Sequence, residues 1–371
     1  MNTTRQQNSK AQTSKPQTNR PQLTKQRAVV ICPGRGTYNK DELGYLQRLH
    51  ADKSEILAEI DALRLAKGQI PVAELDAMAK YNMRVHTPGE NASALIYACA
   101  QGDYQDIDLE QYDIVAVTGN SMGWYIALAV AGALNSSNAI TLINTMGSMM
   151  SEGIIGAQLL YPVVDAQWQQ DSALKLQIQQ WIDEVKQVAG AQLYPSIYLG
   201  GYLVLGGNDK GLQEIEKRLP KIDDKYPMRL FNHAAFHTPL LNEISAKALQ
   251  LLPSSLFEAP KLPLIDGEGK IWQPYSADLD ALYHYTLGRQ VTQPYNFSKA
   301  IEVALKEFAP DTLIILGPGA TLGGAVGQCL VAHQWFDIAS KEDFIHMQKN
   351  EPKVLAMGIA EQRKKVLAKE A

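Results

Sequence analysis

The chain has 371 residues, a hydrophobic content of 46%, a formal charge of −4 and a pI near 6.0. This length predicts one large domain with an insertion, or two domains. The slightly acidic balance argues against nucleic acid as a partner, and no apolar run approaches the roughly 20 residues of a membrane span. Three widely spaced cysteines in apolar surroundings predict buried free thiols of a cytoplasmic protein, with no disulfide framework and no metal site.

Residues 1–27 differ from the rest of the chain. They are rich in Gln, Asn, Thr and Lys, and they carry six basic and no acidic residues. A segment with so little apolar surface cannot offset its ordering entropy, so we expect a disordered basic tail. Such a tail is more often an inert extension than a binding site for an acidic partner.

The first ordered part alternates strands with helices. Strands are expected at 28–32 and 113–118, and helices at 40–65, 71–83, 89–100 and 124–131, with further helix up to 150. A glycine-rich loop at 33–37 follows the first strand. This alternation predicts an α/β fold with a parallel sheet.

The pattern changes between residues 153 and 233. Strands are expected at 154–160, at 198–206 (one bent strand or a pair) and at 228–231, and helices at 171–188 and 210–219. The βαββαβ-like order predicts a small ferredoxin-like subdomain inserted into the fold.

The chain then returns to the larger unit. A helix is expected after His237, strands at 262–265 and 312–316, and helices at 277–288 and 297–308. Residues 28–152 and 234–350 therefore form the predicted large α/β subdomain. The charged stretch 351–371 is predicted to be a surface helix that frays.

A candidate nucleophile lies at Gly119-Asn120-Ser121-Met122-Gly123. A serine at a sharp turn between a strand and a helix has its hydroxyl lifted clear of the sheet, beside backbone N–H groups and a helix N-terminus. The five letters alone would occur by chance in roughly one such chain in ten. The buried strand before them and the helix after them favour a nucleophile over a structural turn serine.

A serine hydroxyl needs a base to take its proton, and the chain has seven histidines. His237 stands at a predicted loop-to-helix junction, where Thr238-Pro239 would open the next helix. His233, four residues earlier, is its main rival. Position alone leaves a capping or core role open for either histidine.

Five motifs stand in a characteristic order. They are Cys32-Pro33-Gly34-Arg35-Gly36-Thr37, Gly119-Asn120-Ser121-Met122-Gly123-Trp124, Ala235-Phe236-His237-Thr238-Pro239-Leu240, Arg289-Gln290 with Gln293-Pro294, and Leu316-Gly317-Pro318-Gly319 with Leu322 and Gly324. Between about residues 28 and 335 they resemble the malonyl-CoA:acyl-carrier-protein transacylase family, the acyltransferases of fatty-acid and polyketide synthesis. The histidine motif resembles that of the family almost letter for letter.

The resemblance implies a role for each matching residue. Ser121 would carry the acyl group as an ester, and His237 would act as the base and later activate the incoming thiol. The backbone carbonyl of Gln290 would orient the imidazole, and the backbone N–H groups of Met122 and Arg35 would form the oxyanion hole. The resemblance further implies ping-pong transfer between thioesters of coenzyme A or phosphopantetheine and an acyl-carrier protein, with no metal or cofactor.

The chain departs from the family around the acyl group. Malonyl-specific members carry an arginine where this chain has Met146, and no arginine occurs between residues 85 and 217. A buried carboxylate without a partner costs several kcal/mol, so we expect a neutral, more apolar acyl group. Met146, Asn120, Trp124 and Phe236 are the predicted acyl-pocket residues.

Arg35 is the main argument against a neutral acyl group. Its side chain is a new cation near the nucleophile, and it has the chemistry to hold a carboxylate or a phosphate of coenzyme A or phosphopantetheine. Three functions remain open: a non-malonyl acyltransferase, an acyl-carrier-protein hydrolase on the same fold, and a non-catalytic docking module. Retention of both Ser121 and His237 argues against the docking module.

Overall fold

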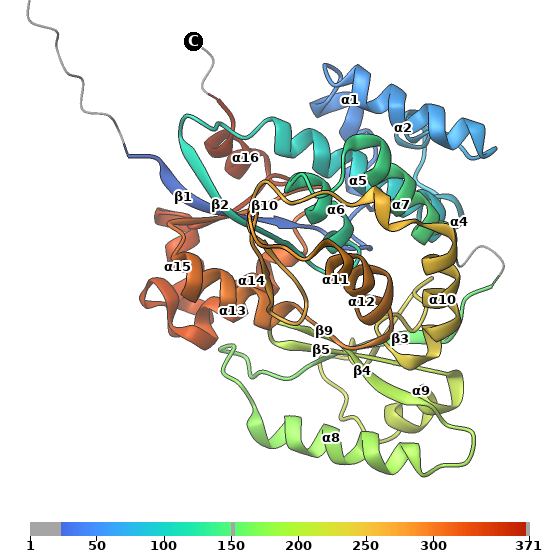
Figure 1. Ribbon diagram of the computed structural model, residues 1–371. Helices are drawn as coiled ribbons and strands as arrows, with labels where there is room; N and C mark the ends of the chain where they lie inside the picture. Colours follow the sequence, from blue (N-terminus) through green and yellow to red (C-terminus); the bar gives the residue numbers. More distant parts are fainter. Residues whose placement is uncertain (1–23, 150–152, 369–371) are drawn as a thin grey trace, which may run out of the picture.

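The computed structural model describes residues 24–149 and 153–368 (Figure 1). Its larger sheet has six strands in the order β11-β10-β1-β2-β7-β8. They are β1 (Gln26–Cys32), β2 (Tyr112–Gly119), β7 (Leu264–Ile265), β8 (Ile271–Trp272), β10 (Thr312–Ile315) and β11 (Val354–Ala356). All neighbours pair in parallel except β7 with β8. The predicted parallel α/β sheet is confirmed.

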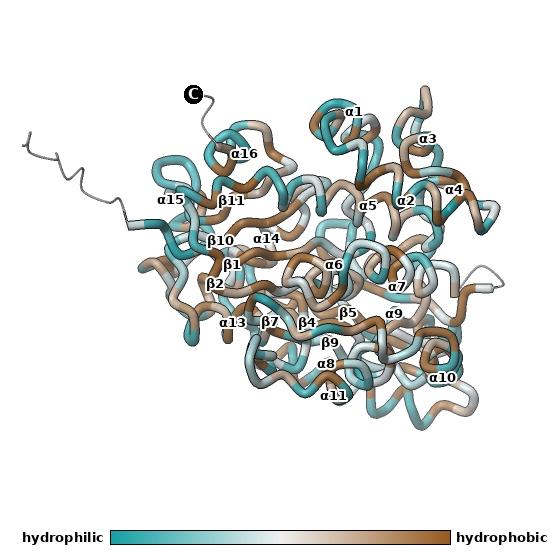
Figure 2. Tube along the Cα trace, turned by 45° about the horizontal axis from the view of Figure 1, so that its top comes forward, coloured by the Kyte–Doolittle hydropathy of each residue, from teal (hydrophilic) through white to brown (hydrophobic). Residues whose placement is uncertain are grey.

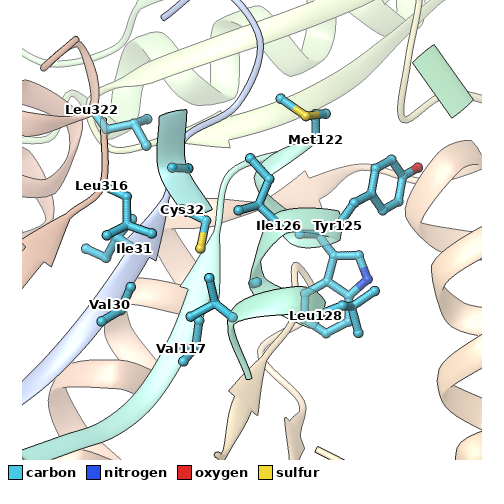
Figure 3. Packing of buried hydrophobic residues seen from close by; sticks show 14 of the residues in the cluster. Val30, Ile31, Cys32, Val117, Met122, Tyr125, Ile126, Leu128, Leu316 and Leu322 are labelled. Atoms are coloured by element: carbon cyan, nitrogen blue, oxygen red, sulfur yellow. The ribbon is translucent and has the colours of Figure 1, made fainter. Parts of the chain in front are cut away.

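Helices cover this sheet on both faces. On one side lie α5 (Gly89–Gln105), α6 (Gly123–Val130) and α7 (Ser136–Ser148), and on the other α13 (Phe297–Phe308) and α14 (Leu322–His333). Residues 28–32 of β1 are fully buried, as expected for a parallel strand with two covered faces. The central strands are accordingly hydrophobic in Figure 2, and Figure 3 shows side chains of β1, β2 and α6 within one cluster.

Further helical segments surround this core. They are α10 (Asn242–Leu251), α11 (Leu279–His284), α12 (Gln290–Thr292), α15 (Lys341–Asn350) and α16 (Ala360–Val366), the 3-10 turns Pro239–Leu241, Ser254–Leu256 and Trp335–Asp337, and a π-helical turn at Tyr285–Arg289. Within the described ranges, no helix is long and apolar enough to cross a bilayer.

Residues 153–233 contribute a second sheet with βαββαβ order. Its elements are β3 (Ala157–Pro162), α8 (Ser172–Lys186), β4 (Leu193–Leu199), β5 (Tyr202–Gly207), α9 (Asp209–Glu216) and β6 (Met228–Leu230). The strand order is β6-β3-β5-β4, with antiparallel neighbours. A fifth strand, β9 (Tyr295–Asn296), comes from outside this segment and pairs in parallel with β4. Residues of the large subdomain therefore extend the small sheet.

The helices predicted at 40–65 and 71–83 are broken in the structure. They are replaced by a 3-10 turn (Lys40–Glu42), α1 (Tyr45–Leu49), α2 (Ser54–Ala66), α3 (Val72–Asp76) and α4 (Met83–His86). Gly44 has a φ of 81°, which interrupts the first helix. The buried Asp76 carboxylate accepts from the Tyr38 hydroxyl at 2.6 Å and from the Gln47 N–H at 3.1 Å. These contacts between separate segments favour short helices over one continuous helix.

The predicted fraying surface helix at 351–371 was wrong. β11 pairs with β10 in the main sheet, and α16 buries Val366 and Arg363. The Arg363 guanidinium pairs with the carboxylates of Asp103 and Asp106 on α5 and its C-cap. An ion pair between distant segments is not visible in the local sequence. The charged residues of 351–371 therefore indicated a solvent-exposed helix, although Arg363 is buried.

The predicted tail falls mostly on residues 1–23, which lie outside the described residues. Its proposed boundary at 27 is two residues too late, because β1 begins at Gln26. The Arg27 side chain donates to the Phe308 carbonyl at 2.6 Å, which fixes this end of the strand.

Candidate active site

Ser121 occupies a strained turn between β2 and α6. Its φ is 55°, and its Oγ lies 2.7 Å from Nε2 of His237. A Cβ at Gly119 would lie 2.2 Å from the Gly123 carbonyl oxygen, and one at Gly123 would lie 2.3 Å from that of Cys32. Both positions therefore require glycine, and together they present the serine at the end of the strand.

His237 lies in the loop that leads from β6 to the 3-10 turn at Pro239–Leu241. Its Nδ1 is 2.5 Å from the backbone carbonyl oxygen of Gln290. The backbone N–H of His237 donates to the backbone carbonyl of Val291 at 2.8 Å. Because a carbonyl only accepts, Nδ1 carries the proton and Nε2 is free to accept from the Ser121 hydroxyl. The structure thus brings together the three residues that the sequence placed far apart.

Burial lowers the pKa of His237 to about 4, although its hydrogen bond to Gln290 acts in the opposite direction. The neutral imidazole that can accept a proton is therefore populated above about pH 4. We expect the rate of Ser121 acylation to change by less than about twofold between pH 8 and pH 5. A histidine with an ordinary pKa would lose about 30-fold over this range. Quenched single-turnover mass spectrometry, with circular dichroism to verify folding at pH 5, measures this dependence.

His233 does not contact Ser121. Its Nδ1 lies 3.2 Å from Oε1 of Gln158, and burial together with the charge of Arg35 lowers its pKa to about 3. Of the seven histidines, all within the described ranges, His237 alone hydrogen-bonds Ser121 Oγ. The geometry therefore favours His237 over His233 as the partner of Ser121.

Two backbone N–H groups near Ser121 have no acceptor in the described part of the protein. Across residues 24–149 and 153–368, the N–H groups of Met122 and Arg35 donate to no protein acceptor. Met122 is the N-cap of α6, where the helix dipole favours negative charge. These two N–H groups are available for an oxyanion, as the resemblance implies.

Ser121 lies at the junction of two cavities. A small one of about 40 Å³ is lined by Arg35, Gly89, Ser93, Ser121, Met122, Tyr125, Ile143, Met146, Gly147, Phe236, His237 and Gln290. A larger cleft of about 590 Å³ runs along the small sheet and also reaches Ser121, Arg35 and Phe236. Among the described residues that line the cleft, one arginine (Arg35) and one lysine (Lys225) carry positive charge, and none is acidic.

The four predicted acyl-pocket residues occupy different places. Met146 and Phe236 line the small cavity, and Asn120 lines the cleft. Trp124 lines neither, so its assignment to the pocket was wrong. Its fully buried indole donates to the Thr286 hydroxyl at 3.0 Å and packs against the π-helical turn, because the first turn of α6 directs it into the core.

Two glycines that the sequence analysis missed close the small cavity. A Cβ at Gly89 would lie 2.6 Å from the Gly147 carbonyl oxygen, and a Cβ at Gly147 would lie 2.6 Å from the Gly89 carbonyl oxygen. Helices α5 and α7 therefore touch directly at this point. Gly147, inside a predicted helix, was the available signal, because a glycine in a helix interior has an energetic cost that close packing can offset.

The Arg35 guanidinium lines both cavities and has no carboxylate within salt-bridge distance in the described part of the chain. Its Nη2 donates to the backbone carbonyls of Thr87 at 2.8 Å and Asn232 at 2.9 Å. Its Nε is buried without a partner. Burial lowers the pKa of Arg35 to about 10, so it stays charged at neutral pH.

Comparison with models of known protein families finds no match. The malonyl CoA-acyl carrier protein transacylase of Bacillus subtilis is 26% identical over 211 residues, which are 56% of this chain and 62% of that protein. The chain thus spans less than two thirds of this relative's length.

Solved structures match over more of the chain. The malonyl-CoA:acyl carrier protein transacylase of Xanthomonas oryzae pv. oryzae covers 93% of this chain and 98% of its own, with a TM-score of 0.70 and 17% identity. A malonyl-transacylase solved in complex with a type II polyketide synthase acyl-carrier protein covers 92% and 99%, with a TM-score of 0.69 and 18% identity. The chain therefore has the fold of the malonyl-CoA:acyl-carrier-protein transacylases and resembles a bacterial transacylase of this name in sequence.

Proposed function

We propose that this protein is an acyltransferase of fatty-acid or polyketide-type biosynthesis, which moves an acyl group from a thioester to an acyl-carrier-protein thiol. The observation that carries the proposal is the hydrogen-bonded chain Ser121–His237–Gln290, which lies where the small cavity meets the cleft. The carrier protein in one structural neighbour supports this partner.

The proposed reaction has two halves. Ser121 Oγ attacks the thioester carbonyl as His237 Nε2 takes its proton, and the N–H groups of Met122 and Arg35 stabilise the oxyanion. The C–S bond then breaks, and the departing thiolate takes the proton from His237. In the second half the acceptor thiol gives its proton to His237 and attacks the ester. The C–O bond then breaks, and Ser121 Oγ leaves with the proton from His237.

We propose a short, neutral acyl group. A cavity of about 40 Å³ has room for about three water-sized groups, which corresponds to a short acyl chain. Met146, Ile143 and Tyr125 give it apolar walls. The resemblance of the motifs implies that Met146 stands where malonyl-specific members have arginine. The charge of Arg35 is partly balanced by the two carbonyls to which it donates.

The cleft suits the phosphopantetheine arm. Its lining carries Arg35 and the exposed Lys225 without an acidic residue, so a phosphate at its mouth would meet favourable charge. The arm would deliver its thioester to Ser121 from the side opposite the small cavity.

Intact-mass spectrometry with a panel of acyl-CoAs and acyl-carrier proteins tests the proposal. A Ser121 adduct with acetyl or propionyl donors that passes to a carrier thiol supports the transferase. Release as free acid would instead identify the hydrolase. No adduct with any donor would favour the docking module. Strong malonyl loading by the native chain would contradict the neutral acyl group and indicate Arg35 as the carboxylate partner.

Met146→Arg is expected to create malonyl loading. The new guanidinium would enter the small cavity and pair with the free carboxylate, so we expect the malonyl adduct to form at least about tenfold faster than in the native chain. Ile345→Arg adds the same charge at an exposed position of α15, outside both cavities, and should leave malonyl loading unchanged. Equal malonyl rates in the three proteins would argue against Met146 as the selecting position.

A further inference from the structure

The orienting role of residue 290 uses only its backbone carbonyl, which any residue would supply. The Gln290 side chain is nevertheless buried, and its amide nitrogen and oxygen each make a hydrogen bond. Its Nε2 donates to the backbone carbonyl of Ser121 at 3.0 Å, and its Oε1 accepts from the hydroxyl of Tyr125 at 2.8 Å. The Gln290 side chain therefore makes contacts that are independent of its backbone carbonyl.

We propose that the Gln290 amide, aligned by the Tyr125 hydroxyl, is a positioning group that holds Ser121 in its strained conformation with Oγ on His237. This inference rests on the proposed acyl-serine function. Ser121 Oγ contacts His237, His237 contacts the Gln290 carbonyl, and the Gln290 amide returns to the Ser121 backbone. The nucleophile, the base and the orienting residue thus form one closed ring of hydrogen bonds.

The direction of each bond in the ring follows from donor chemistry. The Ser121 carbonyl only accepts, so the amide must present its NH₂ group there and its oxygen to Tyr125. Burial raises the pKa of Tyr125, which keeps the phenol protonated and able to donate. Figure 3 shows the Tyr125 hydroxyl directed away from the labelled side chains of β1 and toward the outside of this cluster.

The ring acts at the point where the backbone is strained. A non-glycine residue at a φ of 55° relaxes toward negative φ unless its surroundings hold it there. The Ser121 carbonyl also accepts from the Trp124 N–H at 3.0 Å, which is the ordinary bond of the helix start. The Gln290 amide adds a second donor from a different part of the chain and so links the turn to the residue that orients the base.

A fluorophosphonate tests the inference without knowledge of the acyl donor. Ser121 Oγ forms a bond to phosphorus, the P–F bond breaks, and His237 takes the serine proton as fluoride leaves. Labelling of the full chain gives the limiting rate constant kinact and the half-saturating concentration KI. We expect Tyr125→Phe to lower kinact about fivefold to tenfold and Gln290→Met to lower it further, with KI unchanged in both. A loss of packing alone would not produce this split between kinact and KI.

A double variant and a matched control sharpen the test. Because both groups act through one hydrogen-bonded chain, Tyr125→Phe with Gln290→Met should label no more slowly than Gln290→Met alone. Tyr97→Phe removes a buried hydroxyl that has no partner among the described residues, and it should label at the native rate. If Tyr125→Phe does not fold, Gln290→Met and Gln290→Glu carry the test, since both remove the Nε2 donor and keep the backbone carbonyl.

The outcomes separate this inference from the proposed function. Native labelling with unchanged kinact in the folded Tyr125 and Gln290 variants would overturn the positioning role and leave the acyl-serine function standing. Additive losses in the double variant would overturn the shared chain of bonds. Absence of labelling in the native protein would overturn the proposed function, and this inference with it.

Discussion

Ser121→Ala is expected to abolish the covalent acyl adduct and to reduce transfer at least about 10³-fold to 10⁴-fold. The hydroxyl is the atom that His237 Nε2 contacts at 2.7 Å, and no methyl group can form the ester. His237→Ala should cost a similar factor, and the double variant little more, because nucleophile and base act as one unit. Intact mass after exposure to a donor, combined with the rate of transfer to a carrier thiol, measures all three.

Two controls accompany this prediction. Ser137→Ala removes an exposed hydroxyl from α7 and should keep the full adduct. Circular dichroism of Ser121→Ala should match the native spectrum, since alanine is smaller than serine and keeps the same Cβ at this turn. An adduct of unchanged mass on Ser121→Ala would place the nucleophile elsewhere and contradict the assignment.

Arg363→Met is expected to destabilise the protein by about 3–5 kcal/mol, although Arg363 lines neither cavity at Ser121. Arg363 is 5% exposed, and its guanidinium pairs with Asp103, which is fully buried, and with Asp106. Removing the cation leaves a buried carboxylate whose remaining partners include His50, Tyr45 and the N–H of Gly317. The loss of unfolding free energy is measured by urea denaturation, as a shift of the midpoint with an unchanged m-value.

The same helix supplies the control. Lys364 pairs with Glu361 at 2.9 Å, with side chains 69% and 80% exposed. Lys364→Met should therefore cost less than about 1 kcal/mol, because exposed pairs contribute little. Equal losses in the two variants would contradict the view that the C-terminal segment is anchored by its buried pair.

The parts of the site that the sequence revealed are local. Gly119 and Gly123 on either side of Ser121 predict a tight turn, and the strand before it and the helix after it predict that the turn exposes the serine. His237 is separated from Ser121 by 116 residues, so periodicity could not pair them, and the resemblance to a known motif supplied the pairing. The backbone carbonyl of Gln290 came from the same source.

The parts that the sequence concealed depend on contacts between distant segments. The direction of Trp124 is set by Thr286 in the π-helical turn, which no local pattern foretells. The break in the first long helix follows from Asp76 and Gly44, and the burial of α16 follows from Asp103. In each case a side chain from another segment overrides a local helical or amphipathic preference.

Strand β9 links the two subdomains next to the turn that carries Ser121. Tyr295 pairs with Ile197 of the small sheet through its backbone, while its hydroxyl donates to the Gly119 carbonyl at 2.6 Å. A hinge motion that opened the cleft would have to pull on this residue and hence on the turn that carries Ser121. We therefore expect the cleft to keep its width, because any change in that width would displace the turn that carries Ser121.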